Sequence, residues 1–276
     1  MARLFKGEAY RPYRLRYILS KNEIKIKNTL NKMASNNEIS RIGIITIDGP
    51  AGAGKSTVAR QLALLLSREL GVVFEYIDTG SMYRAATLHA IRNNIDWNNA
   101  DQIAELTALA EIDVVDGETF LNGENVTQIV RAQEITKHTK FAADNNKVRL
   151  IMIQLQQTIA NKLIQQNSGV VTEGRDQGTL VFPDADCKFY LTASPVERAK
   201  RRCSELRLRG VPEQDVNFDQ ILNEINQRDE RDKKREFGAL RQADDAIEIK
   251  TDGIEIPTIL EQLTQIVIDK LSNRQK

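Results

Sequence analysis

Cysteine and histidine are scarce in this chain, which has two residues of each among 276. Cys187 and Cys203 are too few for a disulfide framework and lack the companion ligands of a zinc site, so we expect structural thiols. His89 and His138 exclude a histidine-rich metal centre and leave a Ser-His-Asp triad with two candidate bases. Long apolar runs are also missing: none approaches the ~18 residues of a membrane span, and the N-terminus lacks an apolar signal segment. We therefore predict a cytoplasmic protein without a membrane partner.

The chain as a whole has almost no net charge, but its charged residues are unevenly distributed along the sequence. The chain has 39 Lys and Arg against 38 Asp and Glu. Residues 1–40 hold nine basic and three acidic residues, whereas residues 41–276 hold 30 and 35. We predict a folded domain over 41–276 and a basic extension over 1–40, which is either disordered or lies upstream of a true start at Met33. A basic arm that binds RNA or a membrane surface is the alternative.

A glycine-rich loop follows the first predicted strand. Residues 42–47 form a short apolar run rich in β-branched side chains, as in a buried parallel strand. The sequence GPAGAGKS over 49–56 then matches the pattern G-x-x-x-x-G-K-[ST], and a helical pattern runs on to Gly71. Strand, glycine loop and helix in this order are the context that the pattern requires. The segment therefore predicts a P-loop that binds nucleotide phosphates.

The residue types in this loop have chemical reasons. Gly49, Gly52 and Gly54 let the backbone turn tightly and aim its N–H groups at phosphate oxygens near the positive end of the helix. Lys55 is suited to place a cation on the β- and γ-phosphates, and the Ser56 hydroxyl is suited to ligate Mg²⁺. We therefore expect Mg²⁺ together with a nucleoside triphosphate.

Two other classes of P-loop protein find little support. A regulatory GTPase needs an Asn-Lys-x-Asp guanine reader and an Asp-x-x-Gly switch, and neither pattern occurs in the sequence. A motor or helicase is expected to have a larger core than a chain of this length provides. A kinase acting on a small molecule is therefore the favoured class.

Further apolar runs, separated by helical patterns, predict an α/β fold with a five-stranded parallel sheet covered on both faces. Two insertions interrupt this core. Residues 85–168 hold helical patterns and a hairpin that turns at Asp116 and Gly117, and this region is large enough to close over an acceptor. Residues 194–235 are rich in arginine. The runs after the first strand lie at 72–77, 169–172, 187–191 and 246–249.

Polar side chains follow two of these strands, at the edge of the sheet where ligands bind in α/β folds. The second strand leads into DTGSMYR over 78–84, and the third leads into EGRDQG over 173–178. Arg84 and Arg175 are suited to the phosphate of an acceptor, because a guanidinium group binds two phosphate oxygens at once. These segments predict an acceptor site beside the P-loop.

The arginine-rich insertion has two interpretations. Arg228, Arg231, Asp232 and Arg235 fall on one face of a predicted helix, with three guanidinium groups around one carboxylate. A salt-bridged, solvent-exposed face is the first interpretation. A kinase lid is the second, because mobile arginines closing over the γ-phosphoryl would stabilise its charge and exclude water. The insertion also contains Arg198, Arg201, Arg202, Arg207 and Arg209.

Six sequence blocks together resemble the bacterial cytidylate kinase family, in the order that the family has them. The resemblance runs from about Ile42 to the C-terminus. It implies a P-loop nucleoside monophosphate kinase fold with core, acceptor-binding and lid parts, and ATP- and Mg²⁺-dependent phosphorylation of CMP and dCMP. The blocks are GPAGAGKST (49–57), DTGSMYR (78–84), VRAQEI (130–135), EGRDQGTLVFPDA (173–185), SPVERAKRRC (194–203) and RDERDKKR (228–235).

The resemblance also implies roles for individual residues. Lys55, Arg175, Arg228 and Arg235 look like the catalytic set, with Arg235 and the arginines of 198–209 forming a lid that faces the phosphates. By resemblance, the ATP phosphates meet Gly49, Pro50, Ala51, Gly52, Ala53, Gly54, Lys55, Ser56 and Thr57, and Ser56 is the Mg²⁺ ligand. The acceptor's sugar and phosphate meet Thr79, Arg84, Arg175, Asp176 and Arg228, and its base meets Arg149 and Asp232.

Three positions depart from the family pattern. Ser81 stands where alanine is usual, and Lys250 replaces an acidic residue that is common after the last strand. Lys140 stands nine residues before Arg149, where the family usually has a serine that contacts cytosine. Either Thr139 takes over that contact, or base recognition is altered.

The predicted function is transfer of the γ-phosphoryl group of ATP to CMP or dCMP by a monomer without a nucleic-acid partner. Another P-loop small-molecule kinase, acting on shikimate or a different nucleotide, is one alternative. A non-catalytic nucleotide- or RNA-binding protein is the other.

Overall fold

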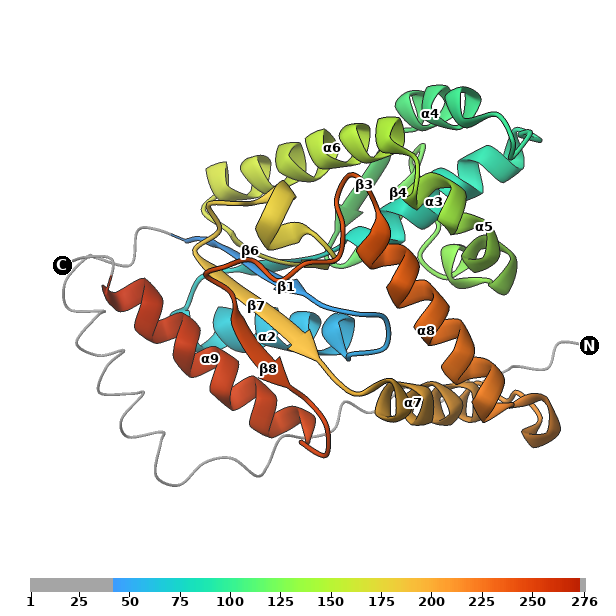
Figure 1. Ribbon diagram of the computed structural model, residues 1–276. Coiled ribbons are helices and arrows are strands. Elements are labelled where there is room, and N and C mark those ends of the chain that lie inside the picture. Colours follow the sequence, from blue (N-terminus) through green and yellow to red (C-terminus); the bar gives the residue numbers. More distant parts are fainter. Residues whose placement is uncertain (1–41, 274–276) are drawn as a thin grey trace, which may run out of the picture. The chain divides into compact units, whose positions relative to one another are not determined.

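The computed structural model describes residues 42–273, so the predicted extension over 1–40 lies outside the described residues. Five parallel strands form the main sheet, in the order β2-β6-β1-β7-β8, with helices on both sides of it (Figure 1). The predicted α/β fold is confirmed. The strands are β1 (Ile44–Asp48), β2 (Phe74–Asp78), β6 (Gly169–Gly174), β7 (Cys187–Thr192) and β8 (Ile247–Lys250).

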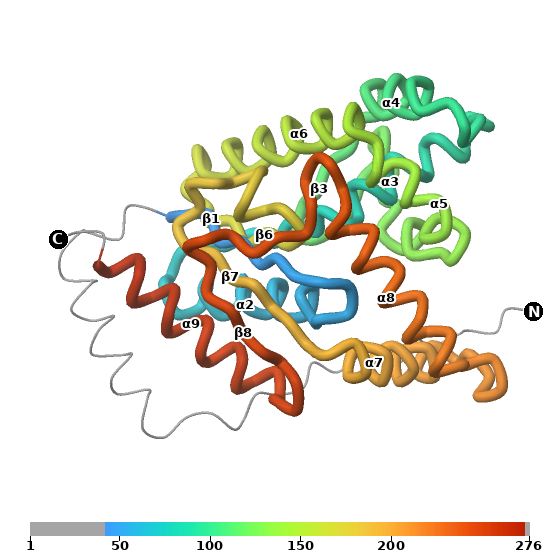
Figure 2. The backbone as a smooth tube through the Cα atoms, viewed as in Figure 1, coloured from blue at the N-terminus to red at the C-terminus, as the bar shows by residue number. Residues whose placement is uncertain are grey.

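The first strand lies at the centre of this sheet. Asp48, at the end of β1, is paired with Gly174 of β6 on one side and Tyr190 of β7 on the other. Because all five strands are parallel, their carboxyl ends meet at one edge. The P-loop after β1 therefore lies between the turn that follows β6 and the segment that follows β7 (Figure 2).

Local signals define the ends of the main helices. The helix after the P-loop begins after Gly54 and ends at Gly71, and both glycines have left-handed backbone. Ser194 caps the helix that follows β7, and Pro195 occupies its first position. The helices are α2 (Lys55–Leu70), α3 (Thr79–Arg92), α4 (Ala100–Leu109), α5 (Gln133–Ala143), α6 (Asn146–Gln165), α7 (Pro195–Leu208), α8 (Phe218–Lys234) and α9 (Ile256–Asn273). Short turns are η1 (Ile129–Arg131), η2 (Gln177–Val181) and η3 (Glu213–Asp215).

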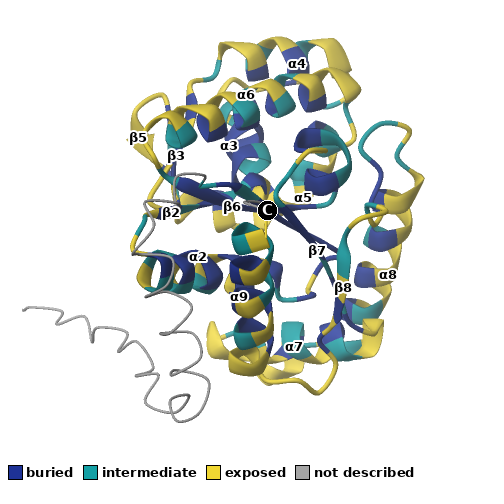
Figure 3. Ribbon diagram, turned by 90° about the vertical axis from the view of Figure 1, so that its left-hand side faces the viewer, coloured by how far each residue is buried: buried dark blue, intermediate teal, exposed yellow. Residues whose placement is uncertain are grey.

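The inner faces of the helices bury the sheet. Helices α3 and α6 lie on one side of it and α2 and α9 on the other (Figure 3). Every residue of β6 is buried, as expected for a strand covered on both faces. One apolar cluster combines Met82 of α3 and Val170 of β6 with Leu121 and Met152, which belong to the insertion between β2 and β6. That region is therefore anchored in the same core as the sheet.

A second, antiparallel sheet lies within the first insertion. Its first two strands are the predicted hairpin, and Asp116 and Gly117 at their turn have φ of 52° and 72°, as a type I′ turn requires. The third strand was not predicted, because a strand of two residues is too short to show an alternating pattern. The strands are β3 (Ile112–Val115), β4 (Glu118–Leu121) and β5 (Glu124–Asn125).

The structure bears on two predictions, one about membrane spans and one about the two cysteines. Across residues 42–273, no helix combines the length and the apolar character needed to cross a membrane. Cys187 and Cys203 are buried and form no disulfide. Burial raises the pKa of the Cys187 thiol to about 11, so it stays protonated and unreactive near neutral pH. This agrees with the expected structural thiols.

Candidate active site

The P-loop wraps closely around Lys55. Gly54 precedes α2 with φ of 89°, and Gly49 lies so close to β7 that an added Cβ would be 2.0 Å from the Leu191 carbonyl oxygen. Lys55 is buried, and its Nζ donates to the Pro50 carbonyl at 2.9 Å. The ammonium group is thereby held at the N-terminus of α2, where the helix dipole favours an anion.

Lys55 has an unusually low affinity for its proton. Burial lowers its pKa to about 7, the guanidinium groups of Arg175 and Arg228 add to this effect, and the carboxylate of Glu173 opposes it. A bound polyanion would reverse the balance, because negative charge beside an ammonium group favours its charged form. The electrostatics of the loop therefore favour a phosphate ligand.

Asp48 joins the P-loop to the turn after β6. Its carboxylate accepts the backbone N–H groups of Gln177 and Gly178 at 2.9 and 2.7 Å. Burial raises the pKa of Asp48 to about 7, although both of these hydrogen bonds oppose the rise. Since Asp48 directly precedes Gly49, its two hydrogen bonds fix the position of the P-loop relative to the loop that contains Arg175.

Oxygen atoms gather at the start of α2. The Ser56 hydroxyl donates to Glu173 Oε1 at 2.7 Å. The Tyr76 hydroxyl is buried and has no hydrogen-bond partner among the described residues. Burial raises the pKa of Tyr76, and the carboxylates of Glu173 and Asp78 raise it further. This is a set of hard oxygen donors beside an orphaned hydroxyl, which suits a hydrated Mg²⁺ ion.

Three guanidinium groups surround one buried carboxylate at the end of α8. Asp232 accepts from Arg175 at 2.9 Å and from Arg235 at 2.6 Å, and Arg228 Nε lies 4.0 Å from it. Burial favours the neutral acid, but the three cations prevail and hold the pKa of Asp232 below its ordinary value. One carboxylate among three cations leaves net positive charge for a second anion.

Arg84 of α3 has the carboxylates of Asp78 and Glu173 nearby but is not directly paired with either of them. It forms no hydrogen bond or ion pair within residues 42–273. Burial lowers its pKa, the carboxylates of Asp78 and Glu173 oppose this shift, and the guanidinium groups of Arg131 and Arg202 add to it. Thr79, at the start of the same helix, donates its hydroxyl to the Glu173 carbonyl at 2.7 Å. A half-buried guanidinium group that makes no direct hydrogen bond or ion pair is suited to bind an anion.

Arg149 and Asp176 form a buried ion pair, in which Arg149 Nη2 donates to Asp176 Oδ2. Arg149 also donates to the carbonyl groups of Ala143 at 3.1 Å and Gly238 at 3.3 Å. The Tyr83 ring centre lies 5.7 Å from its guanidinium carbon. The pair thus joins α5, α6, the turn after β6 and the segment after α8.

Comparisons with known proteins identify the family. The family model for cytidylate kinase matches residues 45–269. The cytidylate kinase of Rhodopirellula baltica is 41% identical over 224 residues, covering 81% of this chain and 92% of the relative. The cytidylate kinase of Bacillus subtilis is 41% identical over 230 residues, covering 82% and 96%. The chain belongs to the cytidylate kinase family. The family resemblance and the enzyme class, a phosphotransferase, are confirmed.

The same domain also occurs in a longer relative. A bifunctional pantoate ligase/cytidylate kinase of Prochlorococcus marinus is 42% identical over 233 residues, which are 83% of this chain and 43% of that protein. Within the present chain, the blocks typical of cytidylate kinases meet at the carboxyl edge of the sheet, because β1, β2 and β6 are neighbours there.

We predicted that three arginines surround one carboxylate on a single helix face, and this prediction was wrong in two respects. The four residues are Arg228, Arg231, Asp232 and Arg235. Arg231 lies beside Asp144, at the end of α5, with 3.4 Å between Nε and Oδ2. Helix α8 ends at Lys234, and Arg235 has φ of −55° and ψ of 135°, so it reaches Asp232 from outside the helix. Arg175 from the turn after β6 takes the place expected for Arg231. Helical spacing cannot foresee such partners, because they come from other elements.

Most arginines of the 198–209 stretch pair with acidic side chains of the same hairpin. This arrangement corresponds to the salt-bridged face, the first interpretation of the segment, and their role as a lid stays a prediction. The pairs, with their N–O distances, are Arg201 with Glu197 (3.2 Å), Arg202 with Glu205 (2.7 Å), Arg207 with Glu213 (2.6 Å) and Arg209 with Glu205 (2.5 Å). Arg198 differs, because it is buried against the P-loop.

Three residues near the site were not singled out from the sequence. Asp48 directly precedes the P-loop and Asp229 lies inside the RDERDKKR block, so their position beside a motif was the available signal. Tyr76 carried no such signal, because an aromatic residue in an apolar strand predicts core packing.

Proposed function

We propose that the P-loop binds the phosphates of ATP and that the arginines around Asp232, together with Arg84, bind the phosphate of the acceptor. As a member of its family, the chain is a (d)CMP kinase that uses ATP. The hydrogen bond from Ser56 to Glu173 carries the site assignment. This bond joins the start of α2, at the proposed ATP site, to the residue two positions before Arg175, at the proposed acceptor site. The two proposed phosphate sites are therefore adjacent.

The proposed reaction is an in-line attack of an acceptor phosphate oxygen on the γ-phosphorus of ATP. A phosphate monoester has a second pKa of about 6, so the attacking oxygen is already anionic at neutral pH and needs no general base. Lys55, Arg175, Arg228 and Arg235 act by holding the two phosphates and neutralising charge in the transition state. Positioning and electrostatics therefore supply the catalysis.

The acceptor site takes residues from several elements. Its proposed members are Thr79, Arg84, Arg149, Arg175, Asp176, Arg228 and Asp232. Residues 85–168 contribute Arg149 and form the acceptor-binding part, and residues 194–235 contribute Arg228 and Asp232 and form the lid. In this proposal the lid's mobile portion is the outer end of the α7–α8 hairpin.

The oxygen cluster fits the Mg²⁺ that accompanies ATP. Ser56 would be the direct ligand, Glu173 would accept hydrogen bonds from the ion's water molecules, and the orphaned Tyr76 hydroxyl would take a partner there. When bound, Mg²⁺ neutralises charge on the β- and γ-phosphate oxygens. Glu173 also keeps the Ser56 side chain in one orientation.

Of the two alternatives at position 140, we favour a base contact by Thr139. Thr139 is half-buried and shares a helix face with Ile135 and Ala142, whereas Lys140 is exposed and its Nζ lies 5.0 Å from the centre of the Phe141 ring. One turn beyond Thr139, the Ala143 carbonyl accepts a hydrogen bond from Arg149. The Thr139 hydroxyl donates to the Ile135 carbonyl at 2.7 Å, so in this proposal it accepts a hydrogen bond from the base.

Exchange of Thr139 for valine is expected to raise KM for CMP about tenfold, because a hydrogen bond to the base is lost while the side-chain shape is kept. The matched variant Lys140→Ala is expected to leave KM within about twofold, since the Lys140 side chain is exposed. Initial rates at saturating ATP measure both. A larger effect at position 140 than at 139 would reject this assignment.

Purified enzyme is expected to turn over CMP and dCMP with kcat/KM at least ~100-fold above that for UMP or AMP. A coupled assay of ADP release across these acceptors and shikimate measures it, with the Lys55→Ala protein as the control for contaminating kinases. We further propose that the enzyme is a monomer without a nucleic-acid partner and that it acts in the cytoplasm, where ATP and nucleotides are available. For a monomer, the rate is expected to be proportional to enzyme concentration. Faster turnover of UMP, AMP or shikimate than of CMP would contradict the assigned acceptor.

A further inference from the structure

A buried ion pair at the base of the α7–α8 hairpin closes on the backbone of the P-loop. Arg198 of α7 and Asp229 of α8 are 3% and 9% exposed, with 2.7 Å between Nη1 and Oδ2. Arg198 Nη1 also donates to the Ala51 carbonyl at 2.9 Å, and Asp229 Oδ1 accepts the Ala51 N–H at 3.4 Å. The two side chains therefore hold both polar backbone groups of one P-loop residue.

The guanidinium group of Arg198 has a single orientation. Its Nε donates to the Ala193 carbonyl at 2.9 Å, in the segment between β7 and α7. A Cβ added to Gly52 would lie 3.3 Å from the Cβ of Arg198, so the loop packs directly on this side chain. A planar fork reaches these acceptors together, which a lysine cannot do.

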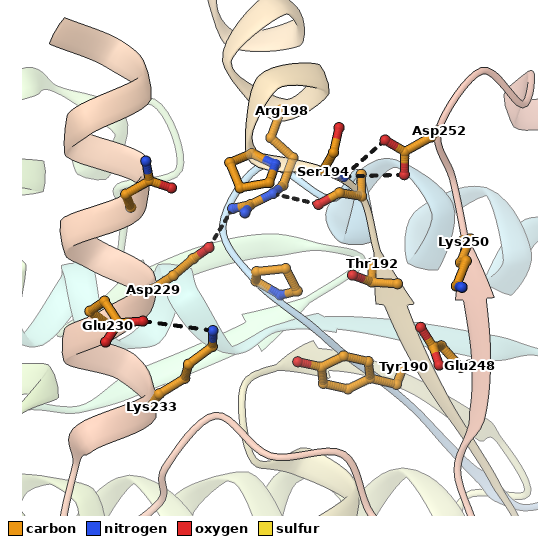
Figure 4. Close-up of a pocket in the computed structure, with 14 residues that line it drawn as sticks. Tyr190, Thr192, Ser194, Arg198, Asp229, Glu230, Lys233, Glu248, Lys250 and Asp252 are labelled. Carbon is orange, nitrogen blue, oxygen red and sulfur yellow. Dashed lines mark hydrogen bonds and ion pairs between the residues drawn. The ribbon is translucent and has the colours of Figure 1, made fainter. Parts of the chain in front are cut away.

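Open space adjoins this contact. A cavity of about 520 Å³ lies beside it, over β7 and β8. Figure 4 shows Arg198 and Asp229 meeting across one end of the cavity, with Tyr190 and Thr192 on the sheet. Pro50 of the P-loop lines the cavity as well. On the side of the loop that faces the cavity, the contacts with the α7–α8 hairpin are made by Arg198 and Asp229.

The same pair links the two proposed phosphate sites. Asp229 lies on α8 between Arg228 and Asp232, which we place in the acceptor site. A displacement of the base of α8 would break the hydrogen bonds to Ala51. The base of the hairpin is thus fastened to the donor loop, and any lid movement is confined to the part of the hairpin beyond Arg198 and Asp229.

We propose that Arg198 and Asp229 are positioning residues that shape the P-loop for ATP and fasten it to the helix that carries the acceptor residues. This inference rests on the proposed role of the P-loop. Neither residue is assigned a contact with the reacting atoms. Removing one partner leaves a buried charge that must move or draw in water, and it disturbs the hydrogen bond that the removed side chain makes with Ala51.

The test compares donor and acceptor affinity in Asp229→Asn, Arg198→Lys and the double variant. Calorimetric titration with Mg²⁺ and a non-hydrolysable ATP analogue, and separately with CMP, is combined with KM for both substrates. We expect the Kd of the analogue and the KM for ATP to rise at least ~10-fold, with CMP values within about threefold. The double variant is expected to be no worse than the worse single variant, because the pair acts as a unit.

An exposed arginine–carboxylate pair of similar geometry is the control. Arg92 donates to Glu124 at 2.6 and 3.0 Å on the surface, so Arg92→Lys and Glu124→Gln are expected to change neither affinity. Equal losses for ATP and CMP, additive effects, or unchanged analogue binding in folded variants would overturn the inference.

Two provisions keep the test decisive. If circular dichroism shows that Asp229→Asn does not fold, Arg198→Lys decides alone, because it retains the charge beside Asp229 and loses the fork that reaches Ala51. The unmodified enzyme is assayed first. Failure of that enzyme to phosphorylate CMP would reject the proposed function, whereas analogue binding would still test the positioning role.

Discussion

Replacement of Lys55 by alanine is expected to lower kcat for CMP phosphorylation at least ~100-fold, the usual effect of removing one electrostatic contact to a transition state. The Lys55 ammonium group is buried within the P-loop and is held by the Pro50 carbonyl. No other lysine lies in the P-loop to replace it. Steady-state rates at saturating ATP and CMP measure the loss.

Lys55→Met keeps most of the side-chain volume and distinguishes a catalytic effect from a structural one. Because burial lowers the pKa of Lys55 to about 7, the charge itself does not stabilise the free enzyme, and the thermal midpoint of Lys55→Met at pH 8 should fall only by the loss of the hydrogen bond to Pro50. Both variants are expected to be equally inactive. Near-normal turnover in either of them would reject the role of Lys55.

Asp232→Asn is expected to lower the free energy of unfolding by about 3 kcal/mol, because it breaks a buried ion pair by neutralising one partner. The carboxylate is 2% exposed and faces Arg175, Arg235 and Arg228. We also expect kcat/KM for CMP to fall ~100-fold, since the arginines that we propose to bind the acceptor phosphate repel one another without the Asp232 carboxylate. Urea denaturation and initial rates measure the two effects.

The matched control for Asp232 is Glu205→Gln, which also removes a carboxylate flanked by two arginines. Glu205 lies on the surface of α7 beside Arg202 and Arg209, so its loss should change stability by less than about 1 kcal/mol. An equal loss in both variants would contradict the importance of burial.

The stabilisation by Asp232 should also depend on pH in a defined direction. Folding lowers the pKa of this acid through its three cations, although burial opposes them. Its contribution is therefore fully present above the unfolded pKa of about 3.9 and is lost as pH falls through the lower folded value. The stability difference between the enzyme and Asp232→Asn should thus be constant from about pH 5 to pH 8.

Local structure was predicted well wherever short-range patterns specify it. The five strands, the P-loop between a strand and a helix, and the hairpin turn at Asp116 and Gly117 all occur within two residues of the expected positions. Such features follow from the spacing of apolar residues and from the backbone conformations that glycine permits. The short strand at Glu124–Asn125 escaped because it has too few residues for a pattern.

Contacts between distant segments were predicted less well. Arg231 pairs with Asp144, and Arg198 turns toward Ala51 rather than toward solvent. These partners are 87 and 147 residues away along the chain. No helical periodicity connects them, because each contact depends on how complete elements pack.

By itself, the sequence determined the family, the P-loop motif and the alternation of strands and helices, since these depend on residue types at short and regular spacing. Only the tertiary structure decided that β1 lies between β6 and β7. It also showed that Arg175 joins Arg228 and Arg235 around Asp232. The hydrogen bonds from a buried ion pair to Ala51 of the P-loop were likewise visible only there. The physical reason is that an arginine can pair with any carboxylate within reach, and packing of the whole chain decides which one that is.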